Sequence, residues 1–497
     1  LNRSHIAMLA RIRPWLLVLS AILASRFIGM ALFPFADTTE PRYAEIARLM
    51  VETGDWITPW FEPGVPFWGK PPLSFWAQAA SIQLFGLSEF VIRLPSWIAT
   101  VGIVYLTWHF ALLLWGKTVA RWSALVFSSM ALTYISAGAV MTDAFLALGT
   151  TLALVSLGLT LNGKSTAWGF LFFVGVAIGL LAKGPLTLVL IGVPIGTWLV
   201  MTRTAPAKLG RLPWLWGCTF TALVVLPWYV LAEWKTPGFI DYFIVGEHVR
   251  RFLDPGWAGD LYGTAHLQPK GMIWVFWIWA SFPWGLIAIS CLAVSWFRGK
   301  GKDSMRALRD PRLLFVFLAT MGPLLFFTPA GNTLWTYALP SLPFTAILIA
   351  YWLTRLDLAR FSKFYYPLAG AVPVLMTVFV LLGTQGVYTL KTEKQLVLEY
   401  EKLADHDSSP LLYLNDLPFS ARYYSRGAAQ EITSEELSAT KANPHYATYF
   451  VAIPKQISQE SVVTWLREAN TELLNRRYRL VSFNPNIHRQ ELSKNDQ

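Results

Sequence analysis

A short charged stretch follows the first long apolar segment of the chain. Residues 37–45 read Asp-Thr-Thr-Glu-Pro-Arg-Tyr-Ala-Glu, directly after the apolar run 14–35. Charged groups at the end of a membrane-embedded helix are unfavourable unless they are paired, and they therefore mark functional sites. Carboxylates are also common general acids and bases. We predict that Asp37 and Glu40 supply an acid–base group, with Arg42 and Tyr43 beside them.

Three further charged residues interrupt apolar sequence. Asp143 is flanked by apolar residues on both sides and needs a cationic partner or a water-filled cavity. Lys183 lies at a tight break between two apolar segments, where its ammonium group can bind a phosphate. Lys70 precedes a pair of prolines and a helix start, and a cation beside free helix N–H groups makes an anion site. The alternative for each is a charged end that simply reaches water.

A mixed cluster of charges occurs further along the chain, at Glu247, His248, Arg250 and Arg251. Its arginines could bind a phosphate, for which Arg250 is the candidate. Its acid and histidine could instead hold a divalent cation, since both are common metal ligands. Tyr337 starts another apolar segment, where it is either a site residue or part of the aromatic belt at a membrane interface.

Long apolar segments must position these residues. Of the 497 residues, 54% are hydrophobic and 14% are charged, whereas soluble domains carry about 25% charged residues. Repeated apolar runs predict a polytopic α-helical membrane protein with about eleven to thirteen transmembrane helices. The spans that we expect are 14–35, 91–114, 119–138, 141–161, 166–182, 184–201, 212–232, 271–297, 312–328, 334–353 and 364–386.

The distribution of basic residues predicts the orientation of the chain. Short loops on one side of the expected spans carry Lys and Arg with almost no acids, so these loops and the N-terminus are expected to be cytoplasmic. The same rule accounts for the formal net charge of +11, and it makes a nucleic-acid partner unnecessary. The long loops 36–90 and 233–270 and the C-terminal tail then face the periplasm or exterior. On this assignment the candidate residues gather at one membrane surface.

The composition divides the chain into two expected domains, a transmembrane catalytic domain at 1–387 and a soluble α/β domain at 388–497 outside the membrane. Two helices lying in the membrane surface are expected within the first long loop, at 40–51 and 73–85. Glu45 and Arg48 are expected to form a surface pair on the first of them. The expected elements of the tail are strands at 411–414, 449–453 and 479–483 and helices at 433–437 and 460–474.

Several motifs occur in the order found in one known family. They are Asp37…Glu40-Pro41-Arg42-Tyr43-Ala44-Glu45-Ile46-Ala47, Gly54-Asp55-Trp56, Gly69-Lys70-Pro71-Pro72, Met141-Thr142-Asp143, Leu181-Ala182-Lys183-Gly184 and Thr336-Tyr337-Ala338-Leu339-Pro340. With these motifs the chain resembles, over nearly its whole length, the bacterial aminoarabinose transferases of lipid A. More broadly it is similar to the protein O-mannosyltransferase-type glycosyltransferases of the GT-C fold.

The resemblance implies an inverting glycosyltransferase in the bacterial inner membrane, with its active site and C-terminal domain in the periplasm. Such an enzyme takes a sugar, 4-amino-4-deoxy-L-arabinose or a related one, from an undecaprenyl or other polyprenyl phosphate donor. The acceptor is lipid A or another periplasm-facing glycolipid or glycan. The resemblance implies Asp37 as the first catalytic acid and Asp143 as the second. The implied donor-phosphate or cavity residues are Arg42, Tyr43, Lys70, Lys183 and Tyr337.

The chain departs from the family pattern in three places. In the family the acid lies close before the Arg-Tyr pair, in a compact Asp-Glu-x-Arg-Tyr motif. Here two threonines separate Asp37 from Glu40, so the two acids compete for that role. Gly69 replaces a family glutamate that can hold a metal with a histidine like His248. The sequence at 334–337 lacks the lysine that the family carries there, which removes a cation.

Other functions remain as alternatives. A protein O-glycosyltransferase or a polysaccharide-modifying transferase would use the same type of donor. A lipid transporter or flippase is the third alternative, but transporters place charged groups near the bilayer midplane. The gathering of ionisable groups at one expected surface favours an enzyme.

Overall fold

The computed structural model separates the chain into two compact units. The first consists of Leu1–Ala31 and Leu49–Phe379, and the second of Leu32–Arg48 and Val380–Gln497. The second unit therefore includes residues 32–48, which the sequence assigned to the membrane domain. A single boundary at 387/388 does not account for this segment. The structure describes residues 14–203, 206–254, 257–263, 266–297, 306–356, 362–384, 390–404, 409–442, 446, 448–456 and 470–483.

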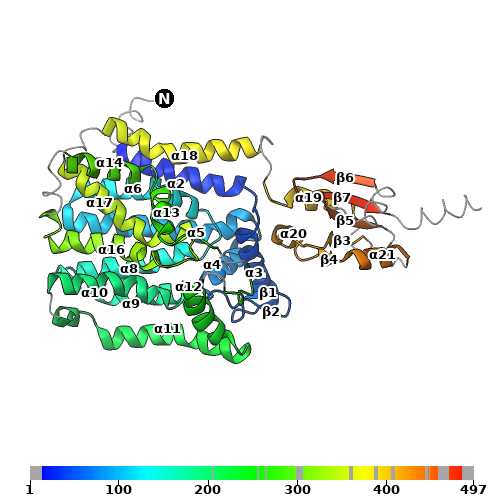
Figure 1. Ribbon diagram of the computed structural model, residues 1–497, viewed down its shortest axis with the longest axis horizontal. Coiled ribbons are helices and arrows are strands. Elements are labelled where there is room, and N and C mark those ends of the chain that lie inside the picture. Colours follow the sequence, from blue (N-terminus) through cyan, green and yellow to red (C-terminus); the bar gives the residue numbers. More distant parts are fainter. Residues whose placement is uncertain are drawn as a thin grey trace, which may run out of the picture. The chain divides into compact units, whose positions relative to one another are not determined.

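The first unit is built from helices (Figure 1). The helical elements up to residue 384 are α2 (Pro14–Leu32), α3 (Thr39–Thr53), α4 (Leu73–Phe85), α5 (Glu89–Trp115), α6 (Lys117–Ser129), α7 (Ala131–Ser136), α8 (Asp143–Leu161), α9 (Ala167–Lys183), α10 (Leu186–Thr202), η1 (Pro206–Arg211), α11 (Trp214–Lys235), η2 (Asp241–Arg250), α12 (Arg251–Leu253), α13 (Met272–Ala280), α14 (Trp284–Phe297), α16 (Pro311–Phe327), η3 (Trp335–Ser341), α17 (Leu342–Arg355) and α18 (Ser362–Thr384). A small hairpin, β1 (Trp60–Glu62) and β2 (Val65–Pro66), precedes α4.

The expected apolar spans all form helices, which confirms a polytopic α-helical membrane protein. Each expected range overlaps one helix or two consecutive helices. Among the described residues, six helices are long and apolar enough to cross a membrane, and α13 with α14, bent by 112°, makes a seventh candidate. This number is below eleven partly because α9, α10 and α16 have 17 residues each. Such a helix rises about 25 Å, slightly less than a hydrocarbon core of about 30 Å.

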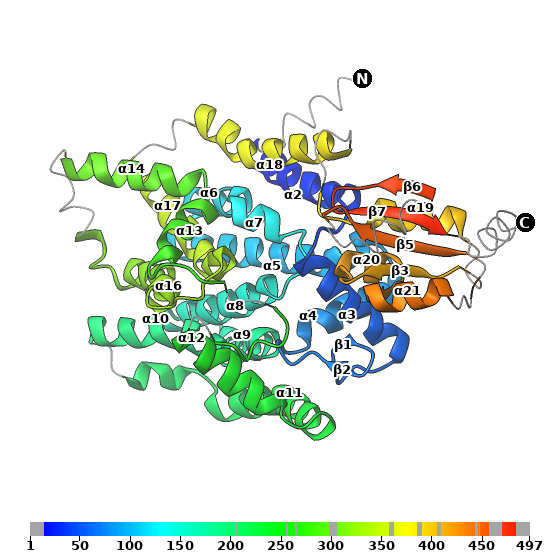
Figure 2. The same ribbon diagram turned by 45° about the vertical axis from the view of Figure 1, so that its right-hand side comes forward.

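Glycines bring α8 and α9 into unusually close contact. A Cβ atom on Gly149 would lie 2.6 Å from the backbone nitrogen of Gly179, and one on Gly175 would lie 2.5 Å from that of Ala153. Small residues allow membrane helices to approach this closely. The two helices run side by side in both views (Figures 1 and 2). A short connection makes them antiparallel, so the first residue of α8 and the last residue of α9 lie at the same end of the pair.

Both helices expected within the first long loop are confirmed. α3 and α4 cover the expected ranges, and α3 ends before Gly54, whose φ of +67° is left-handed and suits glycine. The pair of Glu45 and Arg48 on α3 forms as expected, with two contacts of 2.6 and 2.7 Å. Both residues are buried, so the expectation of a surface pair is wrong. A buried pair keeps a fixed geometry because its partners cannot turn to water.

The second unit contains a five-stranded mixed sheet in the order β4-β3-β5-β7-β6 (Figure 2). Alternate residues along β3 lie in two separate hydrophobic clusters, so both faces of the sheet are covered. The elements are α19 (Lys394–Leu403), β3 (Leu411–Leu414), α20 (Phe419–Tyr424), β4 (Gln430–Ile432), α21 (Ser434–Ala442), β5 (Tyr449–Pro454), β6 (Asn470–Leu474) and β7 (Tyr478–Phe483).

The strands expected in the tail are confirmed, and so is the helix near 433–437. The expected helix at 460–474 is wrong at its end, because 470–474 is the edge strand β6; positions 460–469 lie outside the described residues. Sequence patterns missed β4, α19 and α20. Residues 430–432 form strand β4 by pairing with β3. Because this pairing depends on another segment of the chain, the residues of β4 by themselves give little indication of a strand.

Candidate active site

A buried ion pair connects the adjoining ends of α8 and α9. The Lys183 ammonium lies 2.7 Å from Oδ1 of Asp143, and the two side chains are 8% and 7% exposed. The same ammonium lies 5.1 Å from the centre of the Tyr337 ring, in η3. Gly184 follows with φ +67°, and a Cβ there would be 2.6 Å from the Phe243 ring. Only glycine can end α9 in this way, and this turn fixes Lys183 at the site.

A chain of alternating charges lies in the same unit. Lys70 Nζ contacts Glu247 at 3.1 Å, Glu247 accepts hydrogen bonds of 2.9 and 3.0 Å from Arg251, and Arg251 pairs with Asp260 at 3.4 Å. Burial by itself would raise the pKa of Glu247, but Lys70 and Arg251 outweigh it and hold that pKa below its ordinary value. Glu247 is therefore ionised and orients two cations, which are 21% and 18% exposed.

Tyr337 and His248 bring the ion pair and the charge chain into one site. Tyr337 lies against the Lys183 ammonium, and His248 directly follows Glu247 in η2. His248 Nδ1 lies 2.7 Å from the carbonyl oxygen of Phe243, and Nε2 lies 3.1 Å from that of Lys183. Burial lowers the pKa of His248 more than these carbonyl groups raise it, so the ring is neutral at neutral pH.

The site does not fit the alternative of a divalent cation. The Glu247 carboxylate faces Lys70 and Arg251, and both ring nitrogens of His248 face backbone carbonyl oxygens. The described part of the chain holds no group of three or more His, Cys, Asp or Glu side chains arranged to bind a metal. We therefore derive no chemistry from a metal ion here.

The arginine at this site is Arg251 and not Arg250. Arg250 is exposed at the end of η2, and its role as a phosphate ligand stays a prediction. Arg251 stands four residues after Glu247, and this i,i+4 spacing places the two side chains on one helical face. Arg250 stands three residues after Glu247, a spacing that also allows contact on a helix, so sequence spacing alone does not distinguish the two arginines. The sequence around Asp260 has no spacing that would predict its pairing with Arg251.

The predicted residues of the first loop lie in the second unit. Both carboxylate oxygens of Asp37 accept hydrogen bonds: Oδ1 from the Ser420 N–H at 2.8 Å, and Oδ2 from the Ser420 hydroxyl and from Arg477, each at 2.5 Å. The Asp37 side chain is 3% exposed. Glu40 lies in the first turn of α3 and is half-buried. Of the two acids that compete in sequence, Asp37 is thus the one whose carboxylate is enclosed by the C-terminal segment.

Arg42 and Tyr43 follow on α3. The Arg42 guanidinium lies 5.3 Å from the Tyr43 ring centre and 5.7 Å from that of Phe419, within the distance of a cation–π contact. Tyr43 is buried. Arg42 therefore lies against two aromatic rings in this structure.

Sequence prediction and structure agree on the members of the first-unit site except at one arginine. Six of the predicted residues lie together there: Lys70, Asp143, Lys183, Glu247, His248 and Tyr337. The residues that sequence reasoning missed or left aside are Arg251 and Asp260 in the first unit and Ser420, Glu393 and Arg477 in the second.

The fold matches that of solved membrane enzymes. The crystal structure of ArnT from Cupriavidus metallidurans bound to undecaprenyl phosphate superposes with a TM-score of 0.74, at 17% identity, over 94% of this chain and 97% of that chain. The crystal structure of the same protein in the apo state superposes with a TM-score of 0.75, at 16% identity, over the same shares of the two chains. A family model described as dolichyl-phosphate-mannose-protein mannosyltransferase matches residues 16–243. These matches define the class: a polytopic membrane protein of the GT-C fold with a small C-terminal α/β domain.

Curated relatives narrow this class. The chain is 30% identical over 339 residues to the undecaprenyl phosphate-alpha-4-amino-4-deoxy-L-arabinose arabinosyl transferase of Aeromonas salmonicida, covering 66% of this chain and 58% of the relative. It is 29% identical over 323 residues to arabinosyl transferase 1 of Pseudomonas fluorescens, covering 62% and 52%. The chain thus spans a little over half the length of these relatives. It has the GT-C fold and is similar in sequence to the bacterial aminoarabinose transferases.

Proposed function

We propose that the protein is an integral-membrane glycosyltransferase that uses a polyprenyl-phosphate-linked sugar as donor. The observation that carries this proposal is a set of three cations in a membrane-embedded unit: Lys183 beside the buried acid Asp143, and Lys70 and Arg251 on Glu247. Preorganised cations stabilise negative charge that develops on a leaving group. When the bond from sugar to phosphate breaks, that charge grows on the polyprenyl phosphate.

The carboxylates of the site keep these cations in place before the donor arrives. Each cation has an acidic partner: Asp143 for Lys183, and Glu247 for both Lys70 and Arg251. Lys70 and Arg251 retain some exposure, so they are the groups that an incoming phosphate meets first. Tyr337, with Lys183 over its ring, supplies a hydroxyl to the same place. We propose these four residues as the donor-phosphate site.

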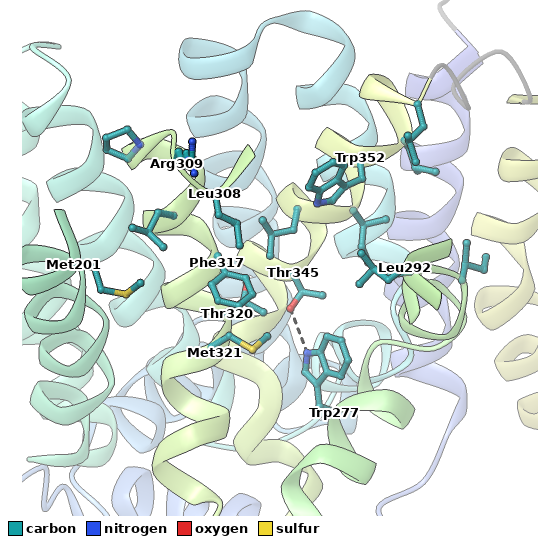
Figure 3. A pocket seen from close by; sticks show the side chains of 18 of the residues that line it. Met201, Trp277, Leu292, Leu308, Arg309, Phe317, Thr320, Met321, Thr345 and Trp352 are labelled. Atoms are coloured by element: carbon teal, nitrogen blue, oxygen red, sulfur yellow. Dashed lines mark hydrogen bonds between the residues drawn. The ribbon is translucent and has the colours of Figure 1, made fainter. Parts of the chain in front are cut away.

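An apolar cavity in the first unit suits the lipid part of such a donor. Its volume is about 910 Å³, and its lining comes mainly from α13, α14, α16 and α17 (Figure 3). At one end Trp277 donates a hydrogen bond of 3.3 Å to Thr345. Thr345 lies in the first turn of α17, directly after the η3 helix that carries Tyr337. A polyprenyl chain whose phosphate is bound near Tyr337 can therefore enter the cavity from this end.

Glu40 and Asp143 have different roles in the proposed reaction. We propose Glu40 as the first-loop carboxylate that orients or deprotonates the acceptor oxygen, because Asp37 is enclosed by its hydrogen-bond partners. Asp143 acts as the second acid and holds Lys183. Attack on the sugar from the side opposite the phosphate inverts its configuration. We further propose a bacterial inner-membrane location with a cytoplasmic N-terminus and a periplasmic C-terminal domain.

The acceptor that we propose is lipid A, since the arabinosyl transferases are among the relatives. A protein hydroxyl is the second candidate, because the family model that matches residues 16–243 describes protein mannosyltransferases. Mass spectrometry of lipid A and of protein glycans, from cells with and without the gene, separates the two. An unchanged lipid A together with an altered protein glycan would assign the acceptor to protein.

A matched pair of arginine variants tests the donor site. In vesicles supplied with undecaprenyl phosphate-linked 4-amino-4-deoxy-L-arabinose and lipid A, the wild-type protein should add one sugar residue. Arg251→Ala should lower kcat/KM by about tenfold or more, because it removes charge-assisted hydrogen bonds of about 1.5–3 kcal/mol. Arg250→Ala, an exposed neighbour, should stay within about twofold of wild type. Equal losses in both variants would remove the basis for this site.

A further inference from the structure

The Asp37 carboxylate is enclosed by three donors in the second unit. Its oxygens accept hydrogen bonds from the N–H and the hydroxyl of Ser420 and from the guanidinium of Arg477. The Asp37 N–H donates to the carbonyl of Lys391 at 2.8 Å. An acceptor substrate cannot reach a carboxylate in these surroundings without displacing Arg477. The contacts therefore indicate a structural partner rather than a group that exchanges protons with a substrate.

Arg477 connects Asp37 to a second buried carboxylate. Its Nη2 and Nε lie 2.7 and 3.0 Å from Oε1 of Glu393, whose side chain is fully buried. The Ser420 hydroxyl accepts a hydrogen bond of 3.1 Å from the Glu393 N–H while it donates to Asp37. Asp37, Glu393, Ser420 and Arg477, here called the clamp, thus form one closed network. Arg477 pairs with both carboxylates, and Asn475 Nδ2 also donates to Oε2 of Glu393 at 2.5 Å. Removal of Arg477 therefore takes this cation from both acids.

Aromatic contacts on either side hold the same segment. The Phe35 N–H donates to the Tyr424 hydroxyl at 2.7 Å, and the Phe35 ring packs edge-on against Tyr423 at 4.9 Å. After Asp37, the Arg42 guanidinium lies over Phe419. The short helix α20 therefore contacts the chain before, at and after Asp37. Two residues beyond Asp37, α3 begins, with Glu40 in its first turn.

We propose that Asp37 is a positioning residue, through which the clamp sets the place of Glu40 and Arg42 at the start of α3. This inference rests on the proposed glycosyl transfer for its functional part. It makes the C-terminal domain a necessary part of the active enzyme, because Arg477, Ser420 and Glu393 all come from that domain. It also explains how the chain accommodates the two threonines between Asp37 and Glu40: the carboxylates have separate tasks.

Hydrogen exchange of the full-length protein in vesicles tests the clamp without reference to activity. In Arg477→Gln the backbone amide of Asp37 should exchange about tenfold or more faster than in wild type, because the segment opens locally. The amides of strand β5 serve as the internal reference and should be unchanged. Ser420→Ala, which removes one donor and keeps Arg477, should give a smaller increase. Arg476→Gln, at an exposed neighbouring position, is the matched control and should leave the Asp37 amide as in wild type.

Kinetics then separate positioning from catalysis. Misplacement of Glu40 should lower kcat by about 100-fold in Arg477→Gln while the donor KM stays within about threefold. Asp37→Asn should have a similar effect. The double variant should be no slower than either single variant by more than about twofold, because both changes break the same network. If Asp37→Asn abolishes transfer while Arg477→Gln retains a normal kcat, Asp37 is a catalytic acid and the proposal is overturned.

The two readouts also separate this inference from the proposed function. A wild-type protein that transfers no sugar would refute the proposed function, while faster exchange in Arg477→Gln would still support the clamp. Unchanged exchange at Asp37 in both Arg477→Gln and Ser420→Ala would overturn the clamp, whatever the activity of these variants.

Discussion

Replacing Lys183 with methionine separates two roles that this lysine has in the proposed enzyme, as partner of Asp143 and as ligand of the donor phosphate. Methionine keeps most of the apolar length of the side chain and removes the charge. The pair is 2.7 Å apart and more than nine-tenths buried. Loss of one partner of such a pair destabilises a protein by about 3–5 kcal/mol, because the other charge stays buried without a counter-charge.

The double variant Lys183→Met/Asp143→Asn removes both charges and should regain most of that stability. The affinity for the donor lipid, unlike the stability, should not recover in the double variant. The lost contact with the phosphate is worth about 1.5–3 kcal/mol, which corresponds to about a tenfold or larger increase in Kd. Asparagine at position 143 cannot replace a cation. We therefore expect the double variant to be as stable as wild type to within about 1–2 kcal/mol, yet to bind the donor lipid as weakly as Lys183→Met.

Binding of undecaprenyl phosphate to the purified protein, measured together with thermal unfolding, provides the assay. The lipid without its sugar is used so that the catalytic role of Asp143 does not enter. Lys235→Met is the control, since Lys235 pairs with Asp55 at 2.6 Å but is 41% exposed, and exposed pairs contribute about 0–1 kcal/mol. Recovery of both stability and lipid affinity in the double variant would show that Lys183 only neutralises Asp143, and the phosphate-binding role would be wrong.

Two further predictions concern the surroundings of Lys183. Gly184→Ala should lower activity and destabilise the protein by about 1–3 kcal/mol, because its Cβ would lie 2.6 Å from Phe243 at φ +67°; Gly192→Ala, where a Cβ has open space, should be neutral in thermal unfolding. His248 has a lowered pKa in the folded protein, so its contribution to stability is complete above the unfolded-state pKa of about 6.5 and is lost as the pH falls below it. Unfolding measured between pH 7 and pH 5 should show this loss, and a His248→Gln variant that kept the same slope would contradict it.

Local patterns in the sequence were enough to place most helices and several site residues. Apolar runs long enough to cross a membrane can be recognised without knowing their neighbours, and all the expected runs became helices. An acid within apolar sequence needs a cation, so Asp143 could be recognised as a residue with a partner. That partner is Lys183, 40 residues away at the end of the adjacent helix. The order of motifs likewise predicted the GT-C fold, which the superposition on the ArnT structures confirms.

The residues of the first loop show where local patterns stop being informative. Asp37 and Glu40 are both acids at the start of one helix, and nothing near them in sequence says which is enclosed. The answer depends on Arg477, which is 440 residues away, just as the environment of Glu247 depends on Lys70, 177 residues away. Such pairs form only when packing brings distant elements together, because burial and the counter-charge are properties of the folded chain. Sequence therefore established the membrane architecture and the kinds of groups at the site, while tertiary structure selected Arg251 over Arg250 and enclosed the Asp37 carboxylate.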